Sequence, residues 1–530
     1  MKHTVRSLHA HAGVSIVGNV AYLSNETLKP QALGKLARWL PHETWFKKAI
    51  EKIGLTPLNG PRSGWINLEA LHLVMERSGY CYIPDAKPFH LLDKSLEPSW
   101  MDKLPPFARR YLRCSYAMTE GIDPLAIVPK FPYMGFGYIV PDGGMAAEAA
   151  QVFHLHRLSG IKQLSFLHDP VLKENDRSAG ALMFEHTRYC HVLDTHAVAN
   201  VIAENVGIKD GHLNTLLTAA ISHDALTPAG GDSVKLVDPA AFDEDAHYPE
   251  LLVGEKWGKY RERFNIDREL LVKTIMGEGL LGHILDIADK SSYLARDVNA
   301  YLMTPNPKID ARYPNLSAVA DIVIKDPYVC AVWESARKYN GSLVFGNAER
   351  LARFLKLRAL MFRGLYYNPY SRFFEYLVGK GVVKYMYQNG LVSRHDLLRE
   401  QDYWIEGKID ETLGTYSMMH RFHNLDNARI EEYLDVNAAA GRAAEFENDH
   451  SVIVILDNFT PATNNGTRKF LVRKGNKAVE FADACPKDAE EIEGIMTFQK
   501  MVHLYFFSAD DLQISLAGRK KLKEIMRSVS

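Results

Sequence analysis

A helix that runs directly into a His-Asp pair most constrains the fold of this chain. Apolar side chains recur at helical spacing along one face, at Leu213, Leu216, Leu217, Ala220 and Ile221. Such a stripe must pack against other elements. His223 and Asp224 follow at once, and then Pro228 and the Gly230-Gly231 pair end the helix. Burying a histidine and a carboxylate is costly unless they are paired or bound to a cation, so the sequence predicts a polar site inside a helical core.

The chain contains three His-Asp pairs, and their surroundings distinguish them. Asp169 precedes a proline, which disfavours helix. His395-Asp396 follows a turn-like segment, and this predicts a helix start capped by Ser393. Only the remaining pair ends an apolar helix, so we take that pair as the candidate for metal binding.

Two further segments offer ligands for a metal ion. Residues 186–207 predict a helix that carries His191, with Arg188 one turn earlier on the same face. Residues 284–297 predict a second helix, in which Asp289 lies in the apolar run LDIAD and needs a partner. Imidazole and carboxylate together suit Mn, Fe, Ni or Zn. We therefore expect one divalent ion to be bound by His191, His223, Asp224 and Asp289.

Each of these residues also has a purely structural interpretation. His191 alone is typical of a hydrogen-bonded core histidine. Asp289 alone is typical of a salt-bridge acid on a helix surface. The His223-Asp224 pair alone could arrange the end of its helix. The metal interpretation rests on all four residues occurring in order, with helices between them.

Net charge and cysteine content restrict the class of protein. The formal net charge is -1, so the chain as a whole has no electrostatic reason to bind nucleic acid or a membrane. Five cysteines without a CxxC pair predict reduced thiols and a cytoplasmic protein. No run approaches the ~20 apolar residues of a membrane span, and the N-terminus shows no signal-peptide pattern.

Hydrophobic periodicity predicts a mostly α-helical chain with a small α+β C-terminal lobe. Helical spacing dominates residues 1–135, 144–304 and 345–410. After residue 450, SVIVILDNF and KFLVRKG predict strands, and residues 511–529 predict a final helix.

Several motifs together resemble the HD superfamily, and most closely the SAM-and-HD-domain deoxynucleoside triphosphate triphosphohydrolases. HRLSGIKQLSF, FEHTRYCHVLD, SHD and DKSSYLARD are similar to motifs of that branch and occur in its order. LRALMFRGLYYNPYSRFFEYL resembles the helix that follows the HD core. The resemblance covers residues 136–400. We expect an N-terminal helical lobe of unknown role at 1–135, an HD phosphohydrolase core at 136–305, a helical extension at 306–410 and an α+β lobe at 411–530.

The resemblance implies roles for the residues that match its motifs. The metal ligands would be His191, His223, Asp224 and Asp289. Arg188 and Lys290 would contact the substrate phosphates, which suits a forked guanidinium and an ammonium group. Contacts to the sugar and the rest of the nucleotide would come from Gln163, Leu164, Tyr293, Asp297, Arg358 and Tyr366.

One departure from the family concerns the group that moves protons. In the family a Gly-His turn and a second histidine follow the HD pair, whereas HDALTPAGGD places Thr227 and Asp232 at those positions. Asp232 could act as an acid or base if its pKa were suitably tuned. His247 is an alternative, and Asp243 and Glu244 are others.

We therefore expect a metal-dependent hydrolase of nucleotide phosphates, most simply one that releases triphosphate from a deoxynucleoside triphosphate. The missing Gly-His turn favours a different HD hydrolase, such as a nucleoside monophosphatase or a phosphodiesterase. A nucleotide sensor that kept the metal site without turnover is a further alternative. The resemblance also implies one divalent metal ion (Mn, Fe, Ni, Zn or Mg), a nucleotide substrate and homo-oligomers.

Overall fold

The structure is a computed structural model that describes most of residues 145–529 and four short strands before them. Within that stretch the description leaves out residues 165–186, 303–315, 327–328, 417, 424, 426–427, 447–448, 450, 460–466, 468 and 497–500. The early strands form two antiparallel hairpins, β1 (Val14–Val17) with β2 (Val20–Leu23) and β3 (Tyr80–Tyr82) with β4 (Phe89–Leu91). The helices predicted within residues 1–135 lie outside the described residues.

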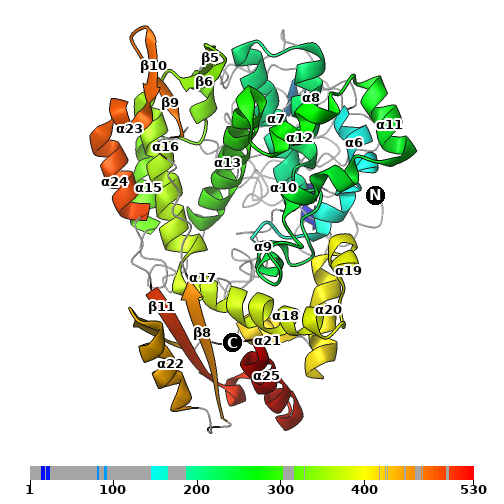
Figure 1. The fold of residues 1–530 in the computed structure, drawn as a ribbon, viewed down its shortest axis with the longest axis vertical. Coiled ribbons are helices and arrows are strands. Elements are labelled where there is room, and N and C mark those ends of the chain that lie inside the picture. The colour runs from blue at the N-terminus through cyan, green and yellow to red at the C-terminus, as the bar shows by residue number, and fades with distance from the viewer. Residues whose placement is uncertain are drawn as a thin grey trace, which may run out of the picture.

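The described chain is mostly α-helical, as the sequence predicts (Figure 1). Three long helices form its centre: α7 (Arg188–Val206), α8 (Asp210–Ser222) and α13 (Gly279–Leu302). α7 packs against both α8 and α13, and every residue of α8 from 215 to 222 is buried. None of the described helices has the length and apolar character needed to cross a membrane.

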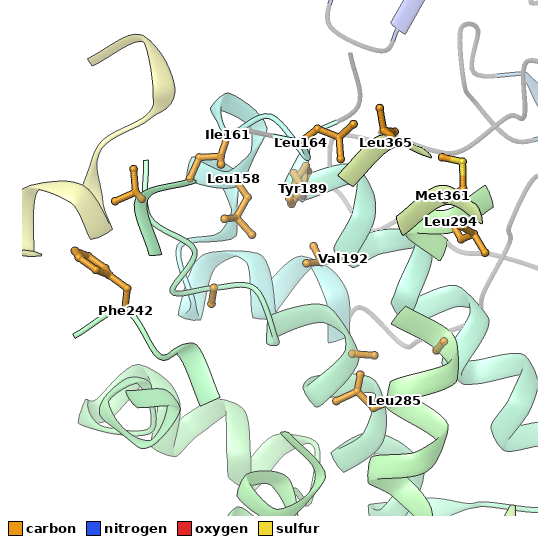
Figure 2. Close-up of a cluster of buried hydrophobic side chains, with 14 of the residues drawn as sticks. Leu158, Ile161, Leu164, Tyr189, Val192, Phe242, Leu285, Leu294, Met361 and Leu365 are labelled. Atoms are coloured by element: carbon orange, nitrogen blue, oxygen red, sulfur yellow. The ribbon is translucent and has the colours of Figure 1, made fainter. Parts of the chain in front are cut away.

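The hydrophobic core extends from these helices into segments that are distant in sequence. Figure 2 shows part of it, including Leu158, Ile161, Leu164, Tyr189, Val192, Leu294, Met361 and Leu365. All of these side chains are buried and belong to one cluster. Burying one such side chain contributes roughly 1.5–3 kcal/mol. The cluster therefore fixes the segments around residues 160 and 363 against α7 and α13.

Shorter helices surround this centre. Those before α13 are α6 (Met145–Val152), η5 (Leu155–Gly160), α9 (Gly231–Lys235), α10 (Glu244–His247), η8 (Tyr248–Leu251), α11 (Gly254–Arg263) and α12 (Arg268–Ile275). Those after it are α15 (Leu316–Lys325), η9 (Val332–Ser335), α16 (Ala348–Met361), η10 (Phe362–Tyr366), α17 (Pro369–Phe374), η11 (Glu375–Val383), α18 (Lys384–Gln388), α19 (Arg394–Arg399), α20 (Asp402–Leu413) and α21 (Met418–His423). Two of them, η10 and η11, are π-helical.

The π-helical segment η11 lies directly against α9. A β-carbon on Gly379 would lie 2.3 Å from the carbonyl oxygen of Ser233, so the two backbones approach too closely for any side chain there. α9 follows the His223-Asp224 pair in the chain. η11 therefore packs onto the segment that comes directly after this polar pair.

Two small sheets complete the fold. One is antiparallel with strand order β7-β11-β8, formed by β7 (Arg429–Tyr433), β11 (Met501–Ser508) and β8 (Val452–Phe459). The other has the order β10-β9-β6-β5, formed by β10 (Lys477–Glu480), β9 (Leu471–Lys474), β6 (Ser342–Phe345) and β5 (Ala336–Tyr339). The strands predicted at SVIVILDNF and KFLVRKG are confirmed as β8 and β9. The parallel pairing of β6 with β9 joins segments on both sides of residue 410.

Helices pack around the two sheets. They are α22 (Val436–Ala444), α23 (Phe481–Ala484), α24 (Pro486–Met496), η12 (Ala509–Leu512) and α25 (Leu516–Val529). The last of these begins later than the residue 511 predicted from sequence. The short turn η12 comes first, and Gln513 then adopts a left-handed backbone with φ of 51°, which interrupts the helix.

Asp402 holds two loops of the core together. Its Oδ1 accepts a hydrogen bond from the Gly230 backbone N–H and its Oδ2 accepts one from the Lys162 backbone N–H, both at 2.8 Å. Arg157 supports the same turn, because its guanidinium donates to the Thr227 carbonyl at 2.6 Å. Since Asp402 is buried, these bonds fix the turn after the His-Asp pair relative to the segment at 161–164.

Asp402→Ala should lower the free energy of unfolding by about 2–3 kcal/mol, because the backbone N–H groups of Gly230 and Lys162 lose a charged acceptor. Urea denaturation measures the change. Asp402→Asn, which keeps one acceptor oxygen, should lose less. Asp396→Ala, which removes the N3 carboxylate of an exposed capping box, should cost about 1 kcal/mol. An Asp402→Ala loss no larger than the Asp396→Ala loss would contradict the bridging role.

A second buried polar cluster joins α17 and η11 to the C-terminal sheet. Arg372 donates to Asp457 of β8, with Nε 3.3 Å from Oδ2, and also to Glu375. Burial raises the pKa of Glu375 against the effect of Arg372, and Asp232 and Asp457 raise it further, to about 7. Glu375 therefore binds a proton more tightly in the folded chain than in the unfolded chain.

Replacing Glu375 by Gln should change how stability depends on pH. Because the folded pKa, about 7, lies above the ordinary value of 4.5, wild-type stability should fall as pH rises through that interval, by about 3 kcal/mol at most. Glu375→Gln should lack this decline, so the variant should gain stability relative to wild type between pH 5 and pH 8. Urea denaturation at both pH values measures the difference, and a difference that does not change with pH would contradict the assignment.

Candidate functional site

Four side chains from three segments converge at one point. His191 comes from α7, Asp289 from α13, and His223-Asp224 from the end of α8. The Nε2 atoms of the two histidines lie 3.2 Å apart, and Asp289 Oδ1 lies 2.9 Å from His191 Nε2 and 3.7 Å from His223 Nε2. The Asp224 carboxylate oxygens lie 3.8 Å from His191 Nε2 and 3.6 Å from His223 Nε2. The four residues predicted as metal ligands therefore share one site.

The donor atoms of this cluster suit a divalent cation. Neighbouring ligands on an ion with ~2.1 Å bonds lie about 3 Å apart, close to the separations observed here. His223 Nδ1 donates to the Ala220 carbonyl at 2.9 Å, which leaves its Nε2 lone pair facing the other donors. Two imidazoles with carboxylates could hold Mn, Fe, Ni or Zn. Within the part of the chain that is described, His191, His223 and Asp224 form a group able to hold a metal ion.

Burial and mutual charge set the protonation of the cluster. Burial alone would raise the pKa of Asp289, but hydrogen bonds from His191 and His223 hold it well below its usual range. Burial likewise opposes ionisation of Asp224, but Arg188 and then His223 lower its pKa. Burial disfavours the charged form of His223, yet the two carboxylates raise its pKa to about 9. The acids are thus anionic, and a cation would take the place of the proton on His223.

A network of ion pairs runs outward from this cluster. Arg188, which is buried, donates to Asp224 Oδ2 at 3.0 Å and to Asp232 Oδ2. Lys235 Nζ lies 2.8 Å from Asp232 Oδ1 and 3.0 Å from Glu244 Oε1. Arg188 is therefore engaged by two carboxylates in this state of the chain.

Asp232 and Glu244 differ in their capacity to move protons. Burial opposes ionisation of Asp232, but Arg188 and Lys235 lower its pKa to about 2. Burial raises the pKa of Glu244 even though Lys235 opposes the shift. An ionised Asp232 donates no proton near neutral pH, so Glu244 is the better suited of the two for acid chemistry.

His247 and Asp243, the other candidates for proton transfer, have partners outside the network of Arg188, Asp232, Lys235 and Glu244. His247 Nδ1 lies 2.6 Å from Glu250 Oε1, and its Nε2 lies 3.0 Å from the Ala240 carbonyl. Both ring nitrogens of His247 thus have partners, and neither partner is one of the four predicted metal ligands. Asp243 is exposed and caps α10 by accepting from the Ala246 N–H.

Aromatic and charged residues from α13 and the α16–η10 segment form a second group beside the cluster. The Tyr293 ring lies 6.4 Å from the His191 ring and 6.3 Å from the Tyr366 ring, measured between centroids. Arg358 Nε donates to the Tyr293 hydroxyl at 3.1 Å, and the Tyr366 hydroxyl donates to Asp297 Oδ2 at 2.6 Å. Four of the residues predicted to contact the nucleotide therefore interact with one another.

Lys290, Gln163 and Leu164 are the remaining residues predicted to contact the substrate. Lys290 pairs with Asp286 one turn earlier on α13. Gln163 and Leu164 are buried, and their segment is held against α7 because Arg188 N–H donates to the Ile161 carbonyl at 2.9 Å. Gln163 Oε1 has no hydrogen-bond partner among the described residues.

Sequence reasoning missed Lys235 and named Glu244 only among alternatives. Neither belongs to a recognisable motif, and the i, i+3 spacing of Asp232 and Lys235 on α9 was the single local signal. The other two His-Asp pairs differ from His223-Asp224. Ser393 and Asp396 form a capping box at the start of α19, as predicted, and His168-Asp169 lies outside the described residues.

Comparison with known proteins assigns no family. No family model matches the chain, and no curated protein matches it. A solved structure of a hypothetical protein from Aquifex aeolicus is similar to it, with 15% identical residues and a TM-score of 0.44, over 73% of this chain and 97% of that chain. The resemblance to the HD triphosphohydrolases remains a prediction from the sequence motifs.

Asp289→Ala should lose a bound divalent ion while the chain stays folded, because it removes one of four converging donors. Elemental analysis of the purified protein measures the metal, and circular dichroism measures the fold. Asp286→Ala is a matched control, since Asp286 lies one turn away on α13 and pairs with Lys290. Equal metal content in both variants and in wild type would contradict the assignment of Asp289 as a ligand.

Proposed function

We propose that the chain is a metal-dependent hydrolase of nucleotide phosphates, with deoxynucleoside triphosphates as the first substrates to test. The supporting observation is the convergence of His191, His223, Asp224 and Asp289. A buried arginine lies on one side of this cluster and an aromatic group on another. This arrangement suits a substrate with an anionic end and a flat, hydroxylated end.

The proposed chemistry divides between the ion and the side chains. A divalent ion held by the four ligands would activate water for attack on phosphorus and offset charge on a phosphoryl oxygen. Arg188 offers a fixed fork of N–H donors to phosphate oxygens. Tyr293 and Tyr366 offer flat faces for the nucleoside, and Tyr366 orients Asp297 to accept from a sugar hydroxyl. Such a hydroxyl contact would discriminate against analogues that lack it.

A different HD hydrolase is the second candidate, and the state of Asp232 favours it. The family resemblance places a histidine at this position, whereas Arg188 and Lys235 keep Asp232 ionised. A substrate whose leaving group needs less help from an acid would suit such a site. Nucleoside monophosphates and cyclic phosphodiesters are therefore the alternative substrates.

Incubation of the purified chain with each dNTP and NTP, in the presence of Mn²⁺ or Mg²⁺, tests the proposal. We expect a deoxynucleoside and triphosphate as products, separated by chromatography, and a loss of at least about a hundredfold in Asp224→Asn, because both the metal site and Arg188 depend on this carboxylate. Glu255→Gln, an exposed change on α11, is the control for charge.

The products distinguish the candidates. Phosphate or a linearised cyclic nucleotide would favour the second candidate. Nucleotide-induced stabilisation in a thermal-shift assay without any product would indicate a sensor, because a ligand stabilises the state that it binds. Wild-type protein that neither binds nor hydrolyses any of these nucleotides would overturn the proposal.

A further inference from the structure

We propose that Lys235 binds a substrate phosphate and that Asp232 occupies the place which the phosphoryl group takes on binding. The inference rests on the proposed function for its class of substrate. It concerns Lys235, which lies outside the family motifs quoted in the sequence.

Asp232 bridges two cations with one carboxylate. Its Oδ2 accepts from Arg188, and its Oδ1 lies 2.8 Å from Lys235 Nζ. A phosphoryl group likewise presents several anionic oxygens on a single atom, and it can therefore span the same two donors. Guanidinium and ammonium groups are the side chains that proteins use to bind phosphate.

The count of charges requires a carboxylate to leave when phosphate arrives. Arg188 and Lys235 contact three acids, namely Asp224, Asp232 and Glu244. Asp224 and Asp232 already match the charges of Arg188 and Lys235, so an added phosphoryl group would give this network an excess of negative charge. One of the acids must therefore move out of the network.

Exposure identifies Asp232 as the acid that moves. Its side chain is 53% exposed, whereas that of Asp224 is 7% and that of Glu244 is 12% exposed. Asp224 also belongs to the metal cluster. Only Asp232 can exchange its ion pairs for water without leaving a buried charge unpaired.

The position of Asp232 between Arg188 and Lys235 indicates how many phosphoryl groups the substrate should have. Arg188 contacts Asp224 of the metal cluster with one amino group and Asp232 with the other. A phosphoryl group in the place of Asp232 would therefore be separated by Arg188 from Asp224, one of the residues that would hold an ion beside the reacting phosphorus. The site accordingly fits a chain of two or more phosphoryl groups better than a single one.

Binding of inorganic phosphate, measured by isothermal titration calorimetry on the protein as purified, tests the inference. Asp232→Asn should bind phosphate about tenfold more tightly than wild type, because the competing carboxylate charge is gone. Lys235→Gln should bind about tenfold more weakly, because one charged donor is gone. Lys235→Arg should stay near wild type.

Controls separate this role from a structural one. Thermal unfolding of each variant reports whether it folds, and Glu255→Gln removes one surface charge far from the bridge. A merely structural Asp232 predicts weaker or unchanged phosphate binding in Asp232→Asn, and that result would overturn the inference. If wild type hydrolyses nucleotides and Asp232→Asn gains no phosphate affinity, the inference fails and the proposed function stands. If no nucleotide is hydrolysed but the phosphate affinities follow the expected order, the proposed function fails and the anion site stands.

Discussion

The structure depends on the convergence of two imidazoles and two carboxylates from three helices. Each of these polar groups is costly to bury alone, and each carboxylate is accommodated because it lies within 3.8 Å of both imidazoles. α7, α8 and α13 must therefore pack in one fixed arrangement, since a shift along any of them would strand a charge inside the core. The apolar side chains around residues 160 and 363 stabilise this arrangement, and the polar cluster specifies it.

The ion pairs of Arg188 connect a buried carboxylate with an exposed one. Asp224 lies at the buried end of this series, and Asp232 lies toward solvent. Charge thus alternates along the contacts from Asp224 through Arg188, Asp232 and Lys235 to Glu244. An anionic ligand arriving from solvent would meet the most replaceable carboxylate of this series first.

Local signals in the sequence predicted much of the fold. The apolar stripe of α8, the cap at Ser393 and the strands β8 and β9 all depend on residues close in sequence, and all are confirmed. The four converging ligands were also predicted from sequence: His223-Asp224 ends an apolar helix, Asp289 lies in an apolar helical run, and His191 lies on a predicted helix in order with them. Pairings between distant residues were missed, such as Lys235 with Glu244, Asp402 with its two loops, and β6 with β9. The π-helical segments were missed as well, because their i→i+5 backbone hydrogen bonds are not specified by any local residue pattern.

The contact between Gly379 and Ser233 limits how α9 and η11 can move relative to each other. Two backbones meet there with no side chain between them, so no rotamer change can absorb a movement of either one. α9 and η11 must therefore shift together or not at all, although they are far apart in sequence. A change in the packing of either segment would therefore also displace the part of the candidate site that carries Asp232.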